Sequence, residues 1–272
     1  MDLTALKAAS PETAIYKTVG RRGLRLYLFR PPNGAGKPAP AVLFFHGGGW
    51  ERETPAMLFP HAAYAASVGA WGICVEYRLT DGKTLSVRDC LRDCADAAVF
   101  VKERAAEWGI DPARLAAFGD SAGAYLAAAL GCAAIAERFI GMREPLVRRV
   151  AYLNGIADLT GKWSFGLFPG GLDVERGPEK WREKFAEAYA LSPLYNASAG
   201  DAETLIWQGL QDTVTEPHTA AVYRNALRAA GAKAELNLLP EAGHAFILFG
   251  LSHPNEACAD VLEGIFRRLG RD

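Results

Sequence analysis

The sequence predicts an α/β protein with a mostly parallel central sheet and helices on both faces. Two observations favour this fold class. Short, continuously apolar segments of the kind buried on both faces alternate with segments whose apolar residues recur at helical spacing. The alternation persists along a chain of 272 residues in which no internal repeat appears. Since α/β folds often use this length in one unit, we expect residues 1–272 to form a single domain.

The expected elements begin with a β-hairpin, because the segments TAIYKTV and LRLYLFRP flank the turn sequence GRRG. Further strands are expected within residues 41–50, 70–79, 111–121, 147–156, 204–210 and 234–244. Helices are expected within residues 57–68, 86–108, 121–139, 218–231 and 255–269. Residues 157–190 interrupt the alternation with two tryptophans and three phenylalanines in glycine-rich surroundings. Connections of this length are usually functional, so we expect a small aromatic cap insertion there, with an ordinary packed subdomain as the alternative.

Composition excludes several classes of partner. Half of the residues are hydrophobic, 22% are charged, and the formal net charge is −1, so neither nucleic acid nor an anionic membrane surface is expected to bind. The first residues lack the apolar core of a signal peptide, and no apolar run is long enough to span a membrane, so we expect a cytoplasmic protein. The five cysteines form no CxxC pair, and Cys90 and Cys94 are better explained as small helix residues than as metal or redox ligands. No metal or cofactor is therefore expected.

The segment FGDSAGAYLAAAL places Ser121 where an apolar strand gives way to an alanine-rich helix. Ligand chemistry in a parallel sheet gathers at the carboxyl ends of the strands. A sharp turn there lifts the serine hydroxyl above the sheet, and Gly119 and Gly123 leave room for that turn. The helix that follows aims its amino terminus at the same place and favours developing negative charge. The pattern predicts a nucleophile at Ser121, with a helix-capping serine as the alternative.

A serine nucleophile needs a base, and the base needs an orienting acid. Of the five histidines, His244 in PEAGHAF stands in the loop after the last expected strand, which suits a base. Asp212 directly follows the strand TLIWQGL, one strand before that loop, and is the favoured acid. Asp158 follows the previous strand and is the competing acid. Asp120 is beside the nucleophile but is expected to point away from it.

The segment HGGGW, residues 46–50, predicts an oxyanion site. Acyl transfer builds negative charge on a carbonyl oxygen, and consecutive glycines let backbone N–H groups approach that oxygen closely. We assign the donors to the amides of Gly48, Gly49 and Ala122, whereas Gly47 shapes the turn. The aromatic residues expected to wall the substrate pocket are Trp50, Trp163, Phe165, Phe168 and Trp181.

Taken together, these motifs resemble the α/β-hydrolase superfamily, and most closely its hormone-sensitive-lipase-like carboxylesterases and the bacterial acetyl-xylan and feruloyl esterases. The segments that carry the resemblance are HGGGW, EYRL, GIDPARLAAFGDSAG, LSPL, GLQDTV and AGHAF, from about residue 40 to 250. The resemblance implies the α/β-hydrolase fold and places the nucleophile, acid and base roles on Ser121, Asp212 and His244. Only 45 residues precede HGGG, Ala124 replaces the last glycine of GDSAGG, and YRLTDGK replaces YRLAPE. These departures favour a compact, small-capped esterase.

The sequence therefore predicts a metal-free serine hydrolase that acts on short-chain carboxylic esters, with acetylated sugars as one candidate substrate. Two other functions stay open. One is an amidase of the kynurenine formamidase type, which also uses an HGG-type oxyanion loop. The other is a non-catalytic ligand-binding module on the hydrolase fold. The expected partner is a small-molecule ester, and the oligomeric state is left open.

Overall fold

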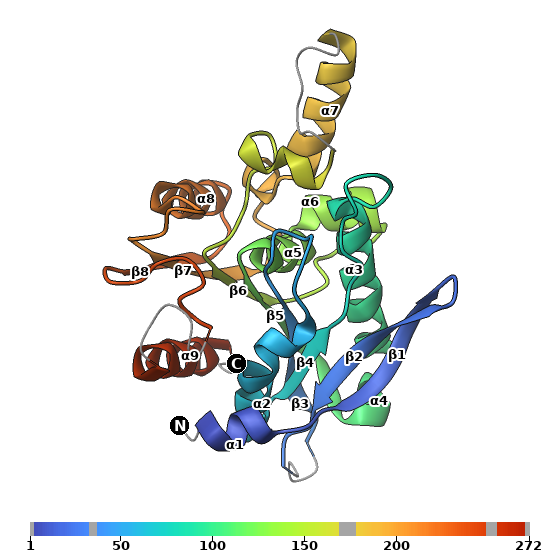
Figure 1. Cartoon of the computed structure of the whole chain (residues 1–272), viewed down its shortest axis with the longest axis vertical. Coiled ribbons are helices and arrows are strands. Elements are labelled where there is room, and N and C mark those ends of the chain that lie inside the picture. The colour runs from blue at the N-terminus through green and yellow to red at the C-terminus, as the bar shows by residue number, and fades with distance from the viewer. Residues whose placement is uncertain (1–2, 33–36, 169–177, 249–254, 270–272) are drawn as a thin grey trace.

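A computed structural model describes residues 3–32, 37–168, 178–248 and 255–269. Within these residues the core is an eight-stranded sheet with the strand order β1-β2-β4-β3-β5-β6-β7-β8 (Figure 1). The pairs β1/β2 and β2/β4 are antiparallel, and all neighbours from β4 across to β8 are parallel. The strands are β1 (Glu12–Val19), β2 (Arg22–Phe29), β3 (Ala39–Phe45), β4 (Trp71–Val75), β5 (Ile110–Asp120), β6 (Arg149–Leu153), β7 (Glu203–Gly209) and β8 (Ala234–Leu239).

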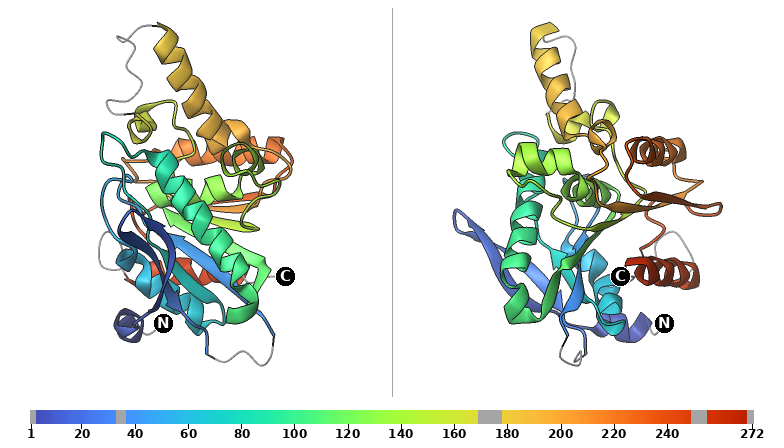
Figure 2. Two further views of the ribbon diagram at one scale, coloured as in Figure 1. Left: turned by 90° about the vertical axis from the view of Figure 1, so that its right-hand side faces the viewer. Right: turned by 180° about the vertical axis from the view of Figure 1, so that it is seen from behind.

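Helices cover both faces of the sheet (Figure 2). The α-helices are α1 (Leu3–Ala8), α2 (Phe59–Ser67), α3 (Val87–Glu103), α4 (Ala105–Trp108), α5 (Ala122–Gly131), α6 (Ala133–Ile135), α7 (Pro178–Leu191), α8 (Pro217–Ala229) and α9 (Asn255–Leu269). Short 3-10 and π-helical turns are η1 (Pro55–Leu58), η2 (Ala136–Ile140), η3 (Lys162–Gly166) and η5 (Pro193–Asn196). Buried residues of α3, α5 and α8 form one apolar cluster with the sheet, and those of α2 and α9 form the other.

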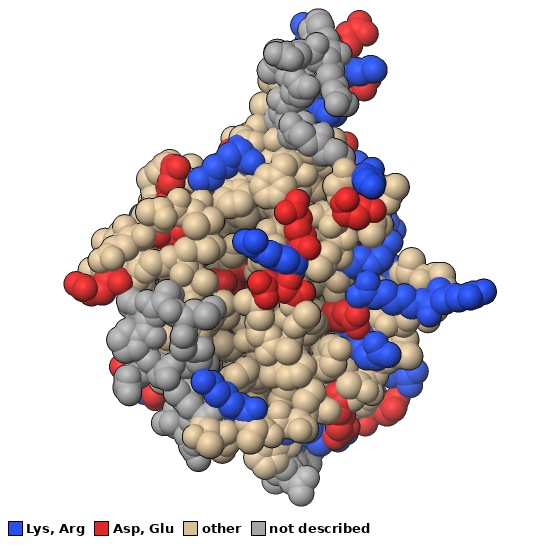
Figure 3. Space-filling view, viewed as in Figure 1, with Lys and Arg blue, Asp and Glu red and all other residues tan. Residues whose placement is uncertain are grey.

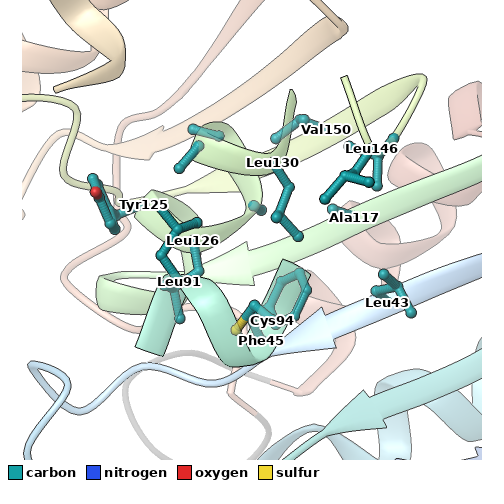
Figure 4. Packing of buried hydrophobic residues seen from close by; sticks show 14 of the residues in the cluster. Leu43, Phe45, Leu91, Cys94, Ala117, Tyr125, Leu126, Leu130, Leu146 and Val150 are labelled. Atoms are coloured by element: carbon teal, nitrogen blue, oxygen red, sulfur yellow. The ribbon is translucent and has the colours of Figure 1, made fainter. Parts of the chain in front are cut away.

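The two clusters follow from the alternation of side chains along each strand. On β3 and β5, Leu43, Phe45 and Ala117 face α3 and α5, as Figure 4 shows for the packing around Leu126. The intervening residues Phe44 and Phe118 belong to the cluster under α2 and α9. Because both faces are covered there, the inner strands β3 and β4 are apolar at every position, which is the pattern that predicted them.

The prediction of one helix over residues 121–139 is wrong in its extent. The helix α5 ends at Gly131, and Cys132 adopts an extended backbone with φ −92° and ψ 116°. A second helical segment then starts because the carboxylate of Asp201 accepts a hydrogen bond of 2.9 Å from the amide of Ala133. Likewise, the helix expected over residues 86–108 is divided at Arg104 into α3 and α4. The short amino-terminal helix α1 was not expected.

A buried ion network holds the segment after β4 against α3. Asp93 has no exposed side-chain surface and accepts hydrogen bonds from the Nε and Nη2 atoms of Arg78, at 2.7 and 2.9 Å. Lys17 on β1 reaches the same carboxylate at 2.6 Å. These bonds outweigh the burial that would otherwise raise the pKa of Asp93, so its pKa is lowered. Asp93 therefore joins three parts of the fold: α3, β1 and the segment after β4, which carries the arginine of the EYRL motif.

The expected cap insertion, residues 157–190, is only partly described, since residues 169–177 lie outside the described ranges. Its described parts include η3, which packs on the main body, and α7, which projects away from that body (Figures 1 and 2). On the face shown in Figure 3, acidic and basic side chains are interspersed without a large field of one sign. In the described ranges, no single helix is long and apolar enough to cross a membrane; α5 and Ala133–Ile140 qualify together by length and composition, but are bent by 79°.

Candidate active site

The nucleophile predicted at Ser121 lies in a strained turn between β5 and α5, at the carboxyl edge of the sheet. Ser121 has φ 55° and ψ −121°, a backbone conformation that residues other than glycine rarely adopt. Two glycines permit this turn. A Cβ atom on Gly119 would lie 2.1 Å from the carbonyl oxygen of Gly123, and one on Gly123 would lie 2.0 Å from that of Phe45. The helix α5 can therefore start directly above β3.

The structure brings Ser121, His244 and Asp212 into one chain of contacts. The His244 Nε2 atom lies 3.0 Å from Ser121 Oγ, and His244 Nδ1 lies 2.8 Å from Asp212 Oδ2. Ser121 is 7% exposed, and the side chain of Asp212 has no exposed surface. These three side chains come from the loops after β5, β7 and β8, which meet at one edge because the strands are parallel.

Asp212 is fixed by its own loop. Its Oδ1 atom accepts hydrogen bonds from the backbone amides of Val214 and Thr215, at 2.8 and 2.9 Å. Its Oδ2 atom lies 2.7 Å from Thr215 Oγ1 and accepts a bond of 3.1 Å from Gln208 Nε2. The carboxylate is therefore already oriented when it meets His244.

Three supporting residues, Gln208, Thr215 and Asn154, were not identified from the sequence. Asn154 has φ 44° and accepts a hydrogen bond of 3.0 Å from the amide of Gly209, which ties the end of β6 to the end of β7. The hydroxyl of Thr215 lies 2.9 Å from the carbonyl oxygen of Asn154. A signal was present, because Gln208 and Asn154 are polar residues within apolar strand segments next to the predicted acid.

The competing acid, Asp158, takes no part in this chain of contacts. Its Oδ1 atom accepts hydrogen bonds from the amide and hydroxyl of Thr160, both at 2.7 Å, and its Oδ2 atom accepts one of 2.9 Å from the hydroxyl of Tyr195. Asp158 therefore lies outside the contacts that join Ser121, His244 and Asp212.

Electrostatics match this arrangement. Burial alone would raise the pKa of Asp212, but hydrogen bonds from His244 and Thr215 outweigh it and lower that pKa to about 2. Burial lowers the pKa of His244, whereas the bond to Asp212 and the charges of Asp120 and Asp212 raise it, and the net shift is upward. His244 is consequently a stronger base than an isolated imidazole.

The HGGGW loop lies directly against the nucleophile. A Cβ atom on Gly47 would lie 3.3 Å from Ser121 Cβ, so the loop approaches the serine at this residue. Gly48 and Gly49 have φ values of +97° and +64°. The carbonyl of Gly48 accepts hydrogen bonds from the amides of Glu51 and Arg52. Among the described residues, nothing accepts a hydrogen bond from the amides of Gly48, Gly49 or Ala122. Freedom from an internal acceptor is a condition for the oxyanion role that the sequence predicts for these N–H groups.

Trp50 occupies a different place from the pocket wall that we expected. Its side chain is fully buried, and its Nε1–H donates a hydrogen bond of 3.0 Å to the carbonyl of Ala122. Its backbone φ is 65°, and its carbonyl accepts a bond of 2.8 Å from the amide of Thr80. The ring does not line a pocket, because it is buried between the glycine loop and α5 and is hydrogen-bonded to α5.

The other predicted wall residues divide into two groups. The rings of Trp163 and Phe165 contact the buried Trp50, with centroid distances of 6.5 and 6.1 Å, so this part of the insertion packs beside the glycine loop. Trp181 instead lies on α7, stacked on Phe185 at 5.0 Å. Phe168 lies under the ammonium group of Lys184. No group of three or more His, Cys, Asp or Glu side chains that could hold a metal occurs in the described part of the chain.

Comparison with known proteins identifies the family. The model of the BD-FAE family matches residues 26–227, three quarters of the chain. The chain belongs to the BD-FAE family. Curated relatives of this BD-FAE protein include Carboxylic ester hydrolase LipN of Mycobacterium tuberculosis, 29% identical over 88% of this chain and 65% of LipN. Another is Probable isoprenylcysteine alpha-carbonyl methylesterase ICME of rice, Oryza sativa, 27% identical over 85% of this chain and 57% of ICME. The chain thus spans only 57% to 65% of the length of these two curated relatives.

Solved structures resemble the BD-FAE protein along nearly the whole length of both chains. The esterase Est2 of Thermogutta terrifontis with bound propionate has a TM-score of 0.80 and 27% identity, over 95% of this chain and 93% of that one. The butyrate-bound form of Est2 gives a TM-score of 0.80 and 26% identity, over 95% and 92%. The prediction of an α/β-hydrolase fold with a mostly parallel sheet is therefore confirmed.

The turn at Ser121 generates a test of stability. Replacement of Gly123 by Ala should lower the free energy of unfolding by roughly 1–3 kcal/mol or more, because the added methyl group meets the Phe45 carbonyl, which belongs to the sheet. Gly264 on α9 is the matched control. No atom lies within 4 Å of its added Cβ, and Gly264→Ala should stabilise the helix by about 0.5–1 kcal/mol. Equal unfolding midpoints in urea for the two variants would contradict the close approach.

Proposed function

We propose that this protein is a serine hydrolase of carboxylic esters with short acyl groups, and that Ser121, His244 and Asp212 are its catalytic triad. The observation that carries the proposal is the chain of contacts from Ser121 Oγ to His244 at 3.0 Å and from His244 to Asp212 at 2.8 Å. The named esterases among its relatives and structural neighbours support the same chemistry.

The mechanism follows from the geometry. His244 Nε2 takes the proton of Ser121 as the serine oxygen attacks the ester carbonyl. Asp212 holds the other ring nitrogen, which fixes the imidazole and stabilises its cation. The amides of Gly48, Gly49 and Ala122 are the proposed donors to the oxyanion. The helix dipole at the amino terminus of α5 stabilises the same negative charge. The alcohol leaves with the proton from His244, and water then hydrolyses the acyl-enzyme by the same steps in reverse.

The acyl side of the proposed substrate is short. Trp163 and Phe165 pack on Trp50, whose indole is bonded to Ala122 beside the nucleophile. We propose that this described part of the insertion forms a shallow wall over Ser121. The structural neighbour Est2 holds propionate and butyrate, which are acids of this size. For the alcohol side, an acetylated sugar is the candidate that a substrate panel should include.

The two rival functions make different demands. A non-catalytic module has no need to keep a nucleophile, base and acid in mutual contact, as this chain does. An amidase of the formamidase type would use the same residues, so geometry favours neither leaving group. Comparing kcat/KM for an aryl formamide and for the corresponding acetyl ester decides between amidase and esterase activity.

Substitution of the triad tests the assignment of roles. Ser121→Ala should lower kcat by about 10⁴-fold or more without loss of the fold. Asp212→Asn should lower kcat by about 10³–10⁴-fold, because His244 loses its orienting partner. Asp158→Asn is the matched control, which removes the same charge from the competing acid and should cost far less. The assignment of the acid is wrong if Asp158→Asn proves the more damaging of the two.

The pH dependence of kcat/KM tests the base. Because His244 must be neutral to accept the serine proton, activity should decrease as the pH falls through the pKa of His244. The bond to Asp212 and the nearby charges raise that pKa, so the midpoint should lie at or above the ordinary value of about 6.5. Measurement with a substrate that does not titrate between pH 5 and 9 gives the midpoint directly. Activity that stays constant down to pH 5 would exclude a histidine base.

The chain-length profile tests the shallow wall. A deep apolar pocket gains about 0.8 kcal/mol for each buried methylene, whereas overfilling a shallow one costs roughly 1 kcal/mol or more. We expect the highest kcat/KM for acetyl to butyryl p-nitrophenyl esters and little activity at eight carbons or more. Trp163→Ala and Phe165→Ala should extend the profile, and Trp181→Ala on the projecting helix is the control. A steady rise from acetate to decanoate would rule out the shallow wall.

A further inference from the structure

Asp120 is a buried carboxyl group that the proposed mechanism does not use. It is the last residue of β5, directly before Ser121, and is 2% exposed. Side chains alternate along β5, so Asp120 points to the same face as Phe118, toward the cluster under α2 and α9. Its Oδ1 atom is fully buried and accepts no hydrogen bond from any described residue. A carboxyl group in this state is costly and calls for an explanation.

Within the described part of the chain, two charged groups act on Asp120. His244 and Asp212 act on it through space: His244 stabilises its negative charge and Asp212 opposes it. Other titratable groups on neighbouring elements are His46, next to Gly47, and His61 on α2, whose ring packs on Phe118. Burial lowers the pKa of both of these histidines to about 4, so they are neutral near pH 7. Among the described residues, the cation that acts on Asp120 is therefore the imidazolium of His244.

The effect is reciprocal. The charge of Asp120 raises the pKa of His244, beyond what Asp212 contributes. Burial, together with the charge of Asp212, raises the pKa of Asp120 itself to about 7, although the His244 cation lowers it. The two groups therefore titrate as a coupled pair. The Asp120 Oδ2 atom also lies against Gly47, 3.4 Å from where a Cβ would be, so the carboxyl group touches the glycine loop as well.

We propose that Asp120 is a positioning residue that acts through His244, as a second counter-ion for the imidazolium formed when Ser121 loses its proton. This inference rests on the proposed function. Asp212 holds His244 by a hydrogen bond, and Asp120 adds its charge from the buried side of the nucleophile turn without a bond. The prediction that Asp120 points away from the nucleophile is compatible with this role, because the charge acts on the base rather than on the serine.

The kinetic test compares Asp120→Asn with the parent enzyme. Loss of the charge should move the acidic midpoint of kcat/KM to lower pH by roughly 0.5–1 unit and lower the plateau kcat by about three- to tenfold. Asp111→Asn is the matched control, since it removes a carboxylate from the opposite end of the same strand and should leave the profile unchanged. A purely structural Asp120 would lower the amount of active enzyme but leave the midpoint in place, and that result would overturn the inference.

The stability test does not depend on turnover. Because the pKa of folded Asp120 is raised from 3.8 to about 7, the carboxyl group destabilises the fold increasingly as the pH rises from about 4 to 7, and fully above 7. The difference in Tm between Asp120→Asn and the parent should therefore be more positive at pH 8 than at pH 5. A pH-independent difference would overturn the inference. Absence of ester turnover by the parent at every pH would instead refute the proposed function.

If Asp120→Asn does not fold, the parent enzyme supplies the measurement. An NMR titration of the Asp120 side-chain carboxyl carbon should show a midpoint well above the ordinary value of about 4, coupled to the titration of His244. A midpoint near 4 with no response to His244 would overturn the proposal.

Discussion

The close approach of three backbone segments at Gly123 is the constraint on which the site depends. The carbonyl of Phe45 at the end of β3, the last residues of β5 and the first turn of α5 meet with no room for a side chain. This contact forces Ser121 into a positive-φ conformation and sets the glycine loop beside it. The hydroxyl group, the proposed oxyanion donors and the start of α5 are thereby fixed by one packing requirement.

The parallel sheet supplies the remaining partners. Because β5, β7 and β8 end at the same edge, loops that are far apart in the sequence bring Asp212 and His244 to the serine. Asn154 and Thr215 link those loops, so that the acid is already oriented within its own turn. The site is therefore rigid where chemistry is proposed, and α7 projects from the other end of the insertion, away from this framework (Figure 1).

Much of this arrangement could be predicted from local sequence patterns. The buried strands are recognisable as apolar runs, and the glycines of GDSAG and HGGGW indicate turns with little room for more side chains. The break at Cys132 could not be predicted, because it depends on the distant carboxylate of Asp201. The burial of Trp50 was equally hidden, since its indole bonds to Ala122, 72 residues away. Asp120 was recognised as a neighbour of the nucleophile, but only the fold shows that its Oδ1 atom is buried without a hydrogen-bond partner among the described residues.

The central claim is that Ser121 is the nucleophile of the enzyme. The most direct measurement is intact-protein mass spectrometry after reaction with a fluorophosphonate, followed by peptide mapping of the adduct. A serine activated by His244 should take up one phosphonyl group per chain, located on Ser121, and prior acidification that protonates His244 should suppress the reaction. An adduct on another residue, or none under conditions in which the protein hydrolyses esters, would contradict this account.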